Sequence, residues 1–114
     1  MSRLLFLASC GVIVALAACQ KSPTEEQADA LSEGGRIRAA SVRIGAEKEA
    51  EALDQRANDL AAKAKAAGGF TGERLAVQAE AAADEADIVR KQGRTKAESV
   101  EEAADAEAKA VRSR

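Results

Sequence analysis

Residues 46–67 read AEKEAEALDQRANDLAAKAKAA, and this stretch decides the fold. Alanine is the strongest helix former, and neither proline nor glycine interrupts the run. Its apolar residues recur at alternating steps of four and three, which is the spacing of a coiled-coil seam. These residues are Ala46, Ala50, Leu53, Ala57, Leu60, Ala64 and Ala67. The stretch therefore predicts a long helix with a narrow seam of mostly methyl-sized side chains.

The rest of the chain after position 18 has the same character. A second seam with heptad spacing contains Leu75, Ala79, Ala82, Ala86 and Val89. Alanine supplies 25 of the 96 residues from position 19 onward, and Ala, Glu, Lys, Leu and Arg together supply 58 of them. Such a composition is typical of long helices and coiled coils. The predicted fold class is all-α: an Ala-rich helical hairpin or short coiled coil, with partly disordered ends.

Glycine and proline divide this helical region. Ser22-Pro23-Thr24-Glu25 has the form of a capping box, and the first helix is expected to stop near Ser32, before a glycine pair. The hairpin is expected to close at residues 68–72, with Phe70 packed against a helix end; a partner-binding role for Phe70 is the alternative. Further helices are expected over residues 36–67, over residues 73–92 up to Gly93, and from a second capping box at residues 95–98 to about residue 111.

The N-terminus carries a targeting signal. Arg3 gives a positive start, and residues 4–18 (LLFLASCGVIVALAA) hold no charge. Such a run spans only about 22 Å as a helix, less than the roughly 30 Å hydrocarbon core of a bilayer. The pattern therefore favours a cleaved secretory signal peptide over a permanent span.

The end of this run, Leu16-Ala17-Ala18-Cys19, resembles the lipobox of bacterial lipoproteins: an aliphatic residue, two small residues and cysteine. The resemblance implies a cleaved signal peptide at residues 1–18, and a diacylglycerol thioether and an N-acyl group on Cys19. Leu7-Ala8-Ser9-Cys10 also fits the box, but it leaves too short an apolar run before the cut, so Cys19 is preferred. An unlipidated, ordinarily cleaved chain or an uncleaved anchor is the alternative.

The same resemblance implies a cellular location and a domain organisation. Two or three acyl chains would anchor the protein stably. In relatives an aspartate after the cysteine retains the protein in the inner membrane; Gln20 stands here, which implies the outer membrane, facing the periplasm. Residues 19–35 would then be the lipidated N-terminus, tether and first short helix. Residues 36–112 would be an Ala-rich helical region with its break at 68–72.

The composition argues against an enzyme active site or a metal site. The chain has no histidine, and only Cys10 and Cys19 as cysteines, so zinc sites and nucleophile–histidine pairs have no ligands or bases. Large apolar residues make up 13 of the 96 residues from position 19, too few to build a pocket that shifts carboxyl pKa values. Basic and acidic residues are mixed along the chain without a basic stripe. We expect no enzymatic activity, catalytic residue, metal, cofactor, small-molecule substrate or nucleic-acid partner.

Two functions remain open from the sequence. The first is a small lipid-anchored envelope lipoprotein with a structural or protein-interaction role, bound to the membrane through Cys19 and to an envelope protein or to itself through its helices. The second is a largely disordered, stress-protective lipoprotein that becomes helical on membrane contact or drying, which its low apolar content and mixed charge favour.

Overall fold

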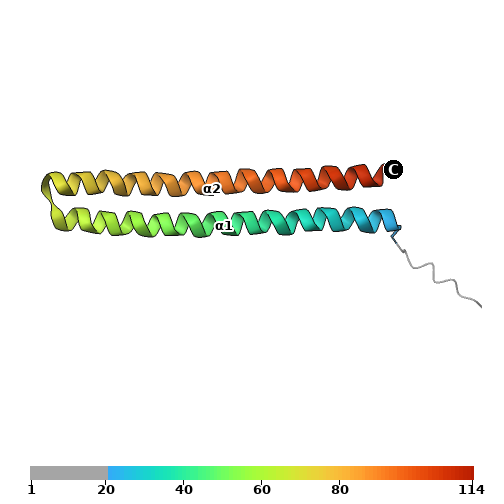
Figure 1. The fold of residues 1–114 in the computed structure, drawn as a ribbon, viewed down its shortest axis with the longest axis horizontal. Coiled ribbons are helices and arrows are strands. Elements are labelled where there is room, and N and C mark those ends of the chain that lie inside the picture. The colour runs from blue at the N-terminus through green and yellow to red at the C-terminus, as the bar shows by residue number, and fades with distance from the viewer. Residues whose placement is uncertain (1–20) are drawn as a thin grey trace, which may run out of the picture.

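The computed structural model describes residues 21–114, which form one antiparallel helical hairpin (Figure 1). Helix α1 spans Pro23–Ala67 and helix α2 spans Gly69–Arg112. At 1.5 Å per residue, the 45 residues of α1 extend about 67 Å. The all-α hairpin predicted from the sequence is confirmed. The predicted signal peptide, the stretch that resembles a lipobox, and Cys19 lie outside the described residues.

The start of α1 is fixed by the predicted capping box. The Ser22 side-chain oxygen accepts a hydrogen bond from the Glu25 backbone N–H at 3.2 Å, and the Glu25 carboxylate accepts one from the Ser22 backbone N–H at 3.2 Å. Pro23 occupies the first turn, where its missing N–H costs nothing. Two free donors of the helix end are thereby satisfied, so this prediction is confirmed.

The predicted interruptions at mid-chain glycines are wrong. α1 continues past Ser32 and through Gly34 and Gly35, and α2 continues through Gly93 and the supposed second capping box to Arg112. A glycine inside a helix costs only about 1 kcal/mol relative to alanine. Alanine-rich flanks and the packing of one helix on the other offset that cost here.

The turn is shorter than predicted, because only Gly68 lies outside both helices. Gly68 and Gly69 have φ values of +62° and +55°, a region that side chains with a Cβ rarely adopt. The Gly72 backbone N–H donates to the Gly68 carbonyl at 2.9 Å, so α2 is already formed within residues 69–72. Phe70 is 75% exposed, which contradicts its predicted packing against a helix end.

The helices meet along a seam of alanine and glycine. No large side chain among the described residues is fully buried, and every buried residue of the two helices is Ala or Gly. The buried residues of α1 are Ala28, Gly35, Ala39, Ala50, Ala57 and Ala64. Those of α2 are Gly72, Ala79, Ala82, Ala86, Gly93, Ala97, Ala104 and Ala108. The hairpin therefore packs backbone against backbone rather than around a core of large side chains.

The predicted heptad seams are confirmed near the turn, where buried residues repeat every seven positions (Ala50, Ala57 and Ala64 on α1; Gly72, Ala79 and Ala86 on α2). Towards the chain ends the seam repeats every eleven residues instead. Ala28, Ala39 and Ala50 are each eleven residues apart, as are Ala86, Ala97 and Ala108, and all six are fully buried. The heptad assignment fails at Ala67, which is exposed, and it leaves out Val42, which is half-buried at the seam. Eleven residues make three turns at 3.67 residues per turn, close to the natural pitch of a helix. The two helices can therefore stay in contact with little supercoiling, and they run nearly straight (Figure 1).

Candidate functional site

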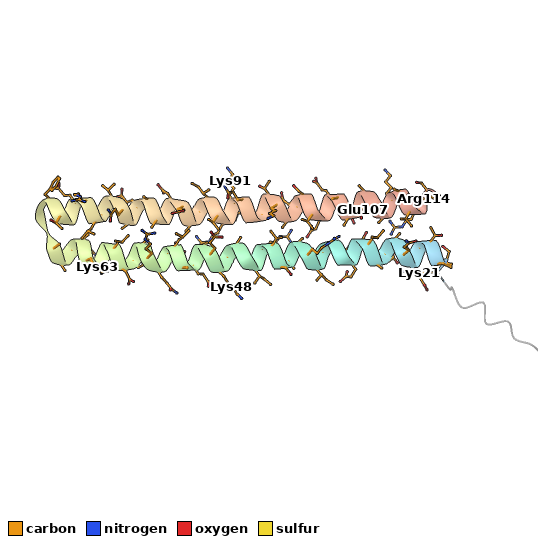
Figure 2. The ribbon with its side chains drawn as sticks, in the orientation of Figure 1. Lys21, Lys48, Lys63, Lys91, Glu107 and Arg114 are labelled. Atoms are coloured by element: carbon orange, nitrogen blue, oxygen red, sulfur yellow. The ribbon has the colours of Figure 1, made fainter. Side chains whose placement is uncertain are left out.

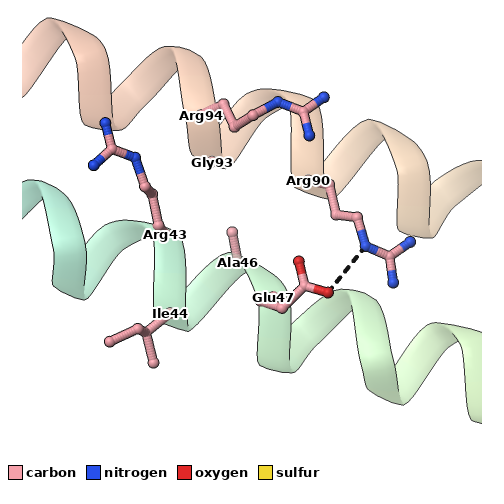
Figure 3. Close-up of a pocket in the computed structure, with 7 residues that line it drawn as sticks. All are labelled: Arg43, Ile44, Ala46, Glu47, Arg90, Gly93 and Arg94. Carbon is pink, nitrogen blue, oxygen red and sulfur yellow. Dashed lines mark hydrogen bonds and ion pairs between the residues drawn. The ribbon is translucent and has the colours of Figure 1, made fainter.

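The closest approach of the helices lies at two glycine–alanine contacts in the middle of the seam. A Cβ built on Gly35 would lie 2.2 Å from the Cβ of Ala104, and one built on Gly93 would lie 2.2 Å from the Cβ of Ala46. Figure 3 shows Ala46 pointing from α1 towards α2 at Gly93. The two contacts are eleven residues apart on each helix, so they fix the register of the hairpin. No larger side chain fits between the helices at either point.

The seam separates two broad faces that differ in chemistry. On one face, here named the aliphatic face, Val42 lines one open hollow with Val100 and the next hollow with Val89. Residues eleven positions apart share a line along each helix, and the six residues of these two lines are all half-buried. The aliphatic face consists of Leu31, Val42 and Leu53 on α1 and Val89, Val100 and Val111 on α2.

The opposite face, here named the ion-pair face, carries charged contacts between the helices. The Arg43 guanidinium lies 3.0 Å from the Glu101 carboxylate, and the Arg112 guanidinium lies 2.9 Å from the Asp29 carboxylate. Within residues 21–114, all ion pairs that join α1 to α2 lie on this face. The charged side chains of this face lie over the alanine lines of the seam, which are fully buried. The valine and leucine side chains of the aliphatic face are only half-buried.

Arg90 is the centre of the ion-pair face. Its guanidinium lies 3.2 Å from Glu47 on α1 (Figure 3). It also contacts Asp54 on α1 and lies 3.3 Å from Asp87 on its own helix. The hydrogen bonds to Asp54 and Glu47 raise the pKa of Arg90 further above its already high value. Its side chain is only 24% exposed, so the stem of Arg90 also covers the seam.

A second charged cluster joins the two chain ends. Asp29 contacts Lys21 ahead of α1 and Arg112 near the end of α2. These hydrogen bonds, first that from Lys21, lower the pKa of Asp29, and the same contact raises the pKa of Lys21. The start of α1 and the end of α2 are therefore tied together at one end of the hairpin, opposite the glycine turn (Figure 1).

Outward-facing charges complete the surface. Lys48 and Lys91 point away from the hairpin along its two outer edges (Figure 2). In the described part of the chain, no group of three or more acidic, cysteine or histidine side chains could hold a metal ion, and no buried side-chain polar atom lacks a hydrogen bond. No helix among residues 21–114 is long and apolar enough to cross a membrane.

Comparisons with family models, with curated proteins and with solved structures find no match to this chain. Sequence reasoning missed the two faces, although the eleven-residue spacing of Leu31, Val42 and Leu53 was a signal that could have found one of them. The ionic partners of Arg90 come from residues far apart in sequence, and only the register of the hairpin brings them together.

Proposed function

We propose that this chain is a small lipoprotein of the bacterial cell envelope, with a structural or protein-interaction role and no enzymatic activity. A lipid on Cys19 would hold it to the membrane. The observation that carries the proposal is the distance from the anchor to the rod, since α1 begins at Pro23, four residues after Cys19. A straight, two-helix rod that starts beside a lipid anchor is suited to presenting surfaces at a fixed distance from a membrane.

The shape of the hairpin defines what such a rod would present. Both α1 and α2 have an end at the anchored side, and the turn at Gly68 lies at the far end (Figure 1). The turn would then stand up to about 67 Å from the anchor. The exposed Phe70 lies at this distal end. The length of the rod, rather than a pocket, is its main structural property.

The site of attachment follows from the lipobox resemblance. Gln20 after the cysteine supports the outer membrane, with the hairpin facing the periplasm. The hollows on the described surface are open, and the charged side chains in the seam region pair with one another across the helices. These features suit contacts with proteins better than chemistry on a small molecule.

The small size of the buried residues supports the second function, that of a largely disordered, stress-protective lipoprotein. Every buried residue of the described helices is Ala or Gly, and each buried methyl group contributes only about 0.8 kcal/mol. A hairpin built this way gains little from its seam, which is what a chain that folds only on membrane contact or drying requires. Circular dichroism of the purified protein separates the two functions. Strong helicity with a cooperative melt in dilute buffer supports the rod, and a coil spectrum supports the disordered alternative.

The proposal is tested by labelled-palmitate incorporation and membrane fractionation of the wild type, Cys19→Ser and Cys10→Ser. We expect Cys19→Ser to lose the label and outer-membrane retention. Cys10→Ser is the matched control, because Cys10 would leave with the signal peptide, and it should retain both. Retention and labelling of Cys19→Ser at the wild-type level would contradict the lipid anchor. Loss of label in Cys10→Ser alone would move the anchor to Cys10.

A further inference from the structure

We infer that the aliphatic face is a docking surface for a second copy of this chain, with the two hairpins stacked face to face and both turns at the same end. This arrangement forms a four-helix bundle. It deepens the proposed function by naming a partner, and only one of the arguments below rests on the lipid anchor. The other arguments come from the burial, area and charges of the face itself.

The first argument is the difference in burial across the seam. The alanine lines beneath the ion-pair face are fully buried, whereas the larger Val42, Val89 and Val100 are only half-buried. In a stable bundle the largest apolar side chains lie in the core. Val42, Val89 and Val100 lie at the rim of this hairpin, and a second layer of helices on the aliphatic face would place these three in the core.

The second argument is area. From Leu31 to Leu53 the face is about 33 Å long, from the helix rise, and it is about 18 Å wide, from the width of two closely packed helices. Two such faces in contact would bury on the order of 1,200 Å² in total, at the lower end of a standard specific interface. The nearly straight helices allow contact along the whole length. A second copy of this hairpin is a partner of matching length.

The third argument is the charge at the rims of two hollows on the aliphatic face. The hollow floored by Val42 and Val100 has Arg38 on α1 and Glu107 on α2 among its lining residues. The neighbouring hollow, floored by Val42 and Val89, has Glu49 on α1 and Lys96 on α2. The signs thus alternate along each helix and are opposite across each hollow. None of these four groups forms an ion pair among the described residues.

A two-fold axis parallel to the helices makes these charges complementary between copies. It lays α1 of one copy on α2 of the other in the register that the hairpin already uses. The backbone of Arg38 in one copy then lies about 9 Å along the axis from that of Glu107 in the other, and Glu49 lies the same distance from Lys96. Helical side chains lean towards the N-terminus of their own helix, which on antiparallel helices brings each of these pairs closer. In this arrangement the two hairpins overlap along their whole length, and the charged groups at the rims of both hollows have partners of opposite charge in the other copy.

The orientation also agrees with the proposed anchor. With both turns at the same end, both copies of Cys19 lie at the other end, and one membrane can hold both lipids. The arrangement with turns at opposite ends would separate the two anchors by about the length of the rod. This is the step that rests on the proposed function.

The test is cysteine crosslinking of the full chain in the cells that make it. Leu31→Cys and Leu53→Cys each place one thiol on the aliphatic face, near the anchored end and nearer the turn. Ala40→Cys, an exposed position of α1 off this face, is the matched control. The wild type controls for crosslinks through its own cysteines. Whole cells are treated with a short, membrane-permeant bis-maleimide and then fractionated, and both the membrane and the soluble fractions are scored for crosslinked product and for retention.

We expect dimer as the major product for Leu31→Cys and for Leu53→Cys, and monomer for Ala40→Cys and the wild type. Dimer formed only when the Leu31→Cys and Leu53→Cys chains are expressed together would overturn the same-end arrangement. Monomer at both positions in a chain that circular dichroism shows to be helical, or a crosslink to a different protein, would overturn self-docking. Dimer at both positions in a chain that is not retained in the membrane would leave the inference standing and would contradict the lipid anchor.

Discussion

A glycine in the seam between the helices and a glycine on the outer surface of the same helices differ in the space available for a side chain. Gly35 lies in the seam, where an added Cβ would come within 2.2 Å of Ala104, while its neighbour Gly34 would meet nothing within 4 Å. Gly93 and Gly45 form a similar pair, one in close contact and one open. Two residues with the same local propensity therefore have different roles, and only the partner helix distinguishes them.

The difference shows what glycine contributes to this fold. At Gly35 and Gly93 it lets two backbones approach more closely than two alanines would allow. At Gly34 and Gly45 it only weakens the helix, by about 1 kcal/mol relative to alanine. The turn is a third case, because Gly68 and Gly69 are required by their positive φ.

Alanine substitutions at the seam glycines and at the outer glycines should give the largest changes in the free energy of unfolding, in opposite directions. Gly35→Ala with Gly93→Ala should lower the free energy of unfolding, because overpacking costs about 1–3 kcal/mol per site and the gain in helix propensity offsets only about 1 kcal/mol of that. Gly34→Ala with Gly45→Ala, the matched control, should raise it by up to about 2 kcal/mol. Thermal melts followed by circular dichroism at one protein concentration measure both. Stabilisation by the seam pair would show that the helices are not held in this close contact.

The sequence predicted the class of the fold because alanine content and the capping box at Ser22 are local signals. The turn was also predicted, from the three glycines within residues 68–72, and within residues 21–114 only Gly68 and Gly69 have positive φ. The lengths of the helices did not follow. Glycine was read as a helix end, whereas the contact energy between α1 and α2 carries Gly35 and Gly93 inside continuous helices.

The heptad seams were predicted correctly near the turn, because Ala50, Ala57 and Ala64 repeat every seven residues there. The eleven-residue repeat nearer the chain ends was missed, although Val42 and Leu53 are eleven residues apart. An eleven-residue repeat keeps the seam on one side of a nearly straight helix. The ion-pair face could not be predicted, since the contacts of Arg90 depend on a register that is set by small residues elsewhere in the seam.

Breaking the ion-pair face should have a smaller effect than filling the seam. Arg90→Met keeps the aliphatic stem and removes the charge, and we expect a small drop in melting temperature, because ion pairs in contact with solvent contribute little to stability. The wild type should also lose part of its stability in high salt, and the variant less. Arg94→Met, on the same helix and without an ion pair in the described structure, is the control. Equal melts for wild type and Arg90→Met would mean that this network is energetically silent.

The cluster at the chain ends should make stability depend on pH. The pKa of Asp29 lies below its ordinary 3.8 in the folded protein, because Lys21 and Arg112 favour the carboxylate. Its contribution is therefore complete above that value and is lost as the pH falls through the lower pKa of the folded state. We expect Asp29→Asn to melt below the wild type at neutral pH and to match it in strong acid. A difference between the two that does not change with pH would contradict a role for the charge, and Asp59→Asn controls for the substitution itself.

The smallest effect is expected at the tip. Phe70 is 75% exposed beside a turn that its glycines already hold, so Phe70→Ala should change the free energy of unfolding by less than about 0.5 kcal/mol. A loss well above this value would show that Phe70 packs against the hairpin in solution, as the sequence suggested. Gly68→Ala is the matched control at the same turn, since its φ of +62° makes that change costly without touching the aromatic ring. If only the glycine variant is destabilised, the turn holds the hairpin, and the exposed ring contributes nothing to the fold of the isolated chain.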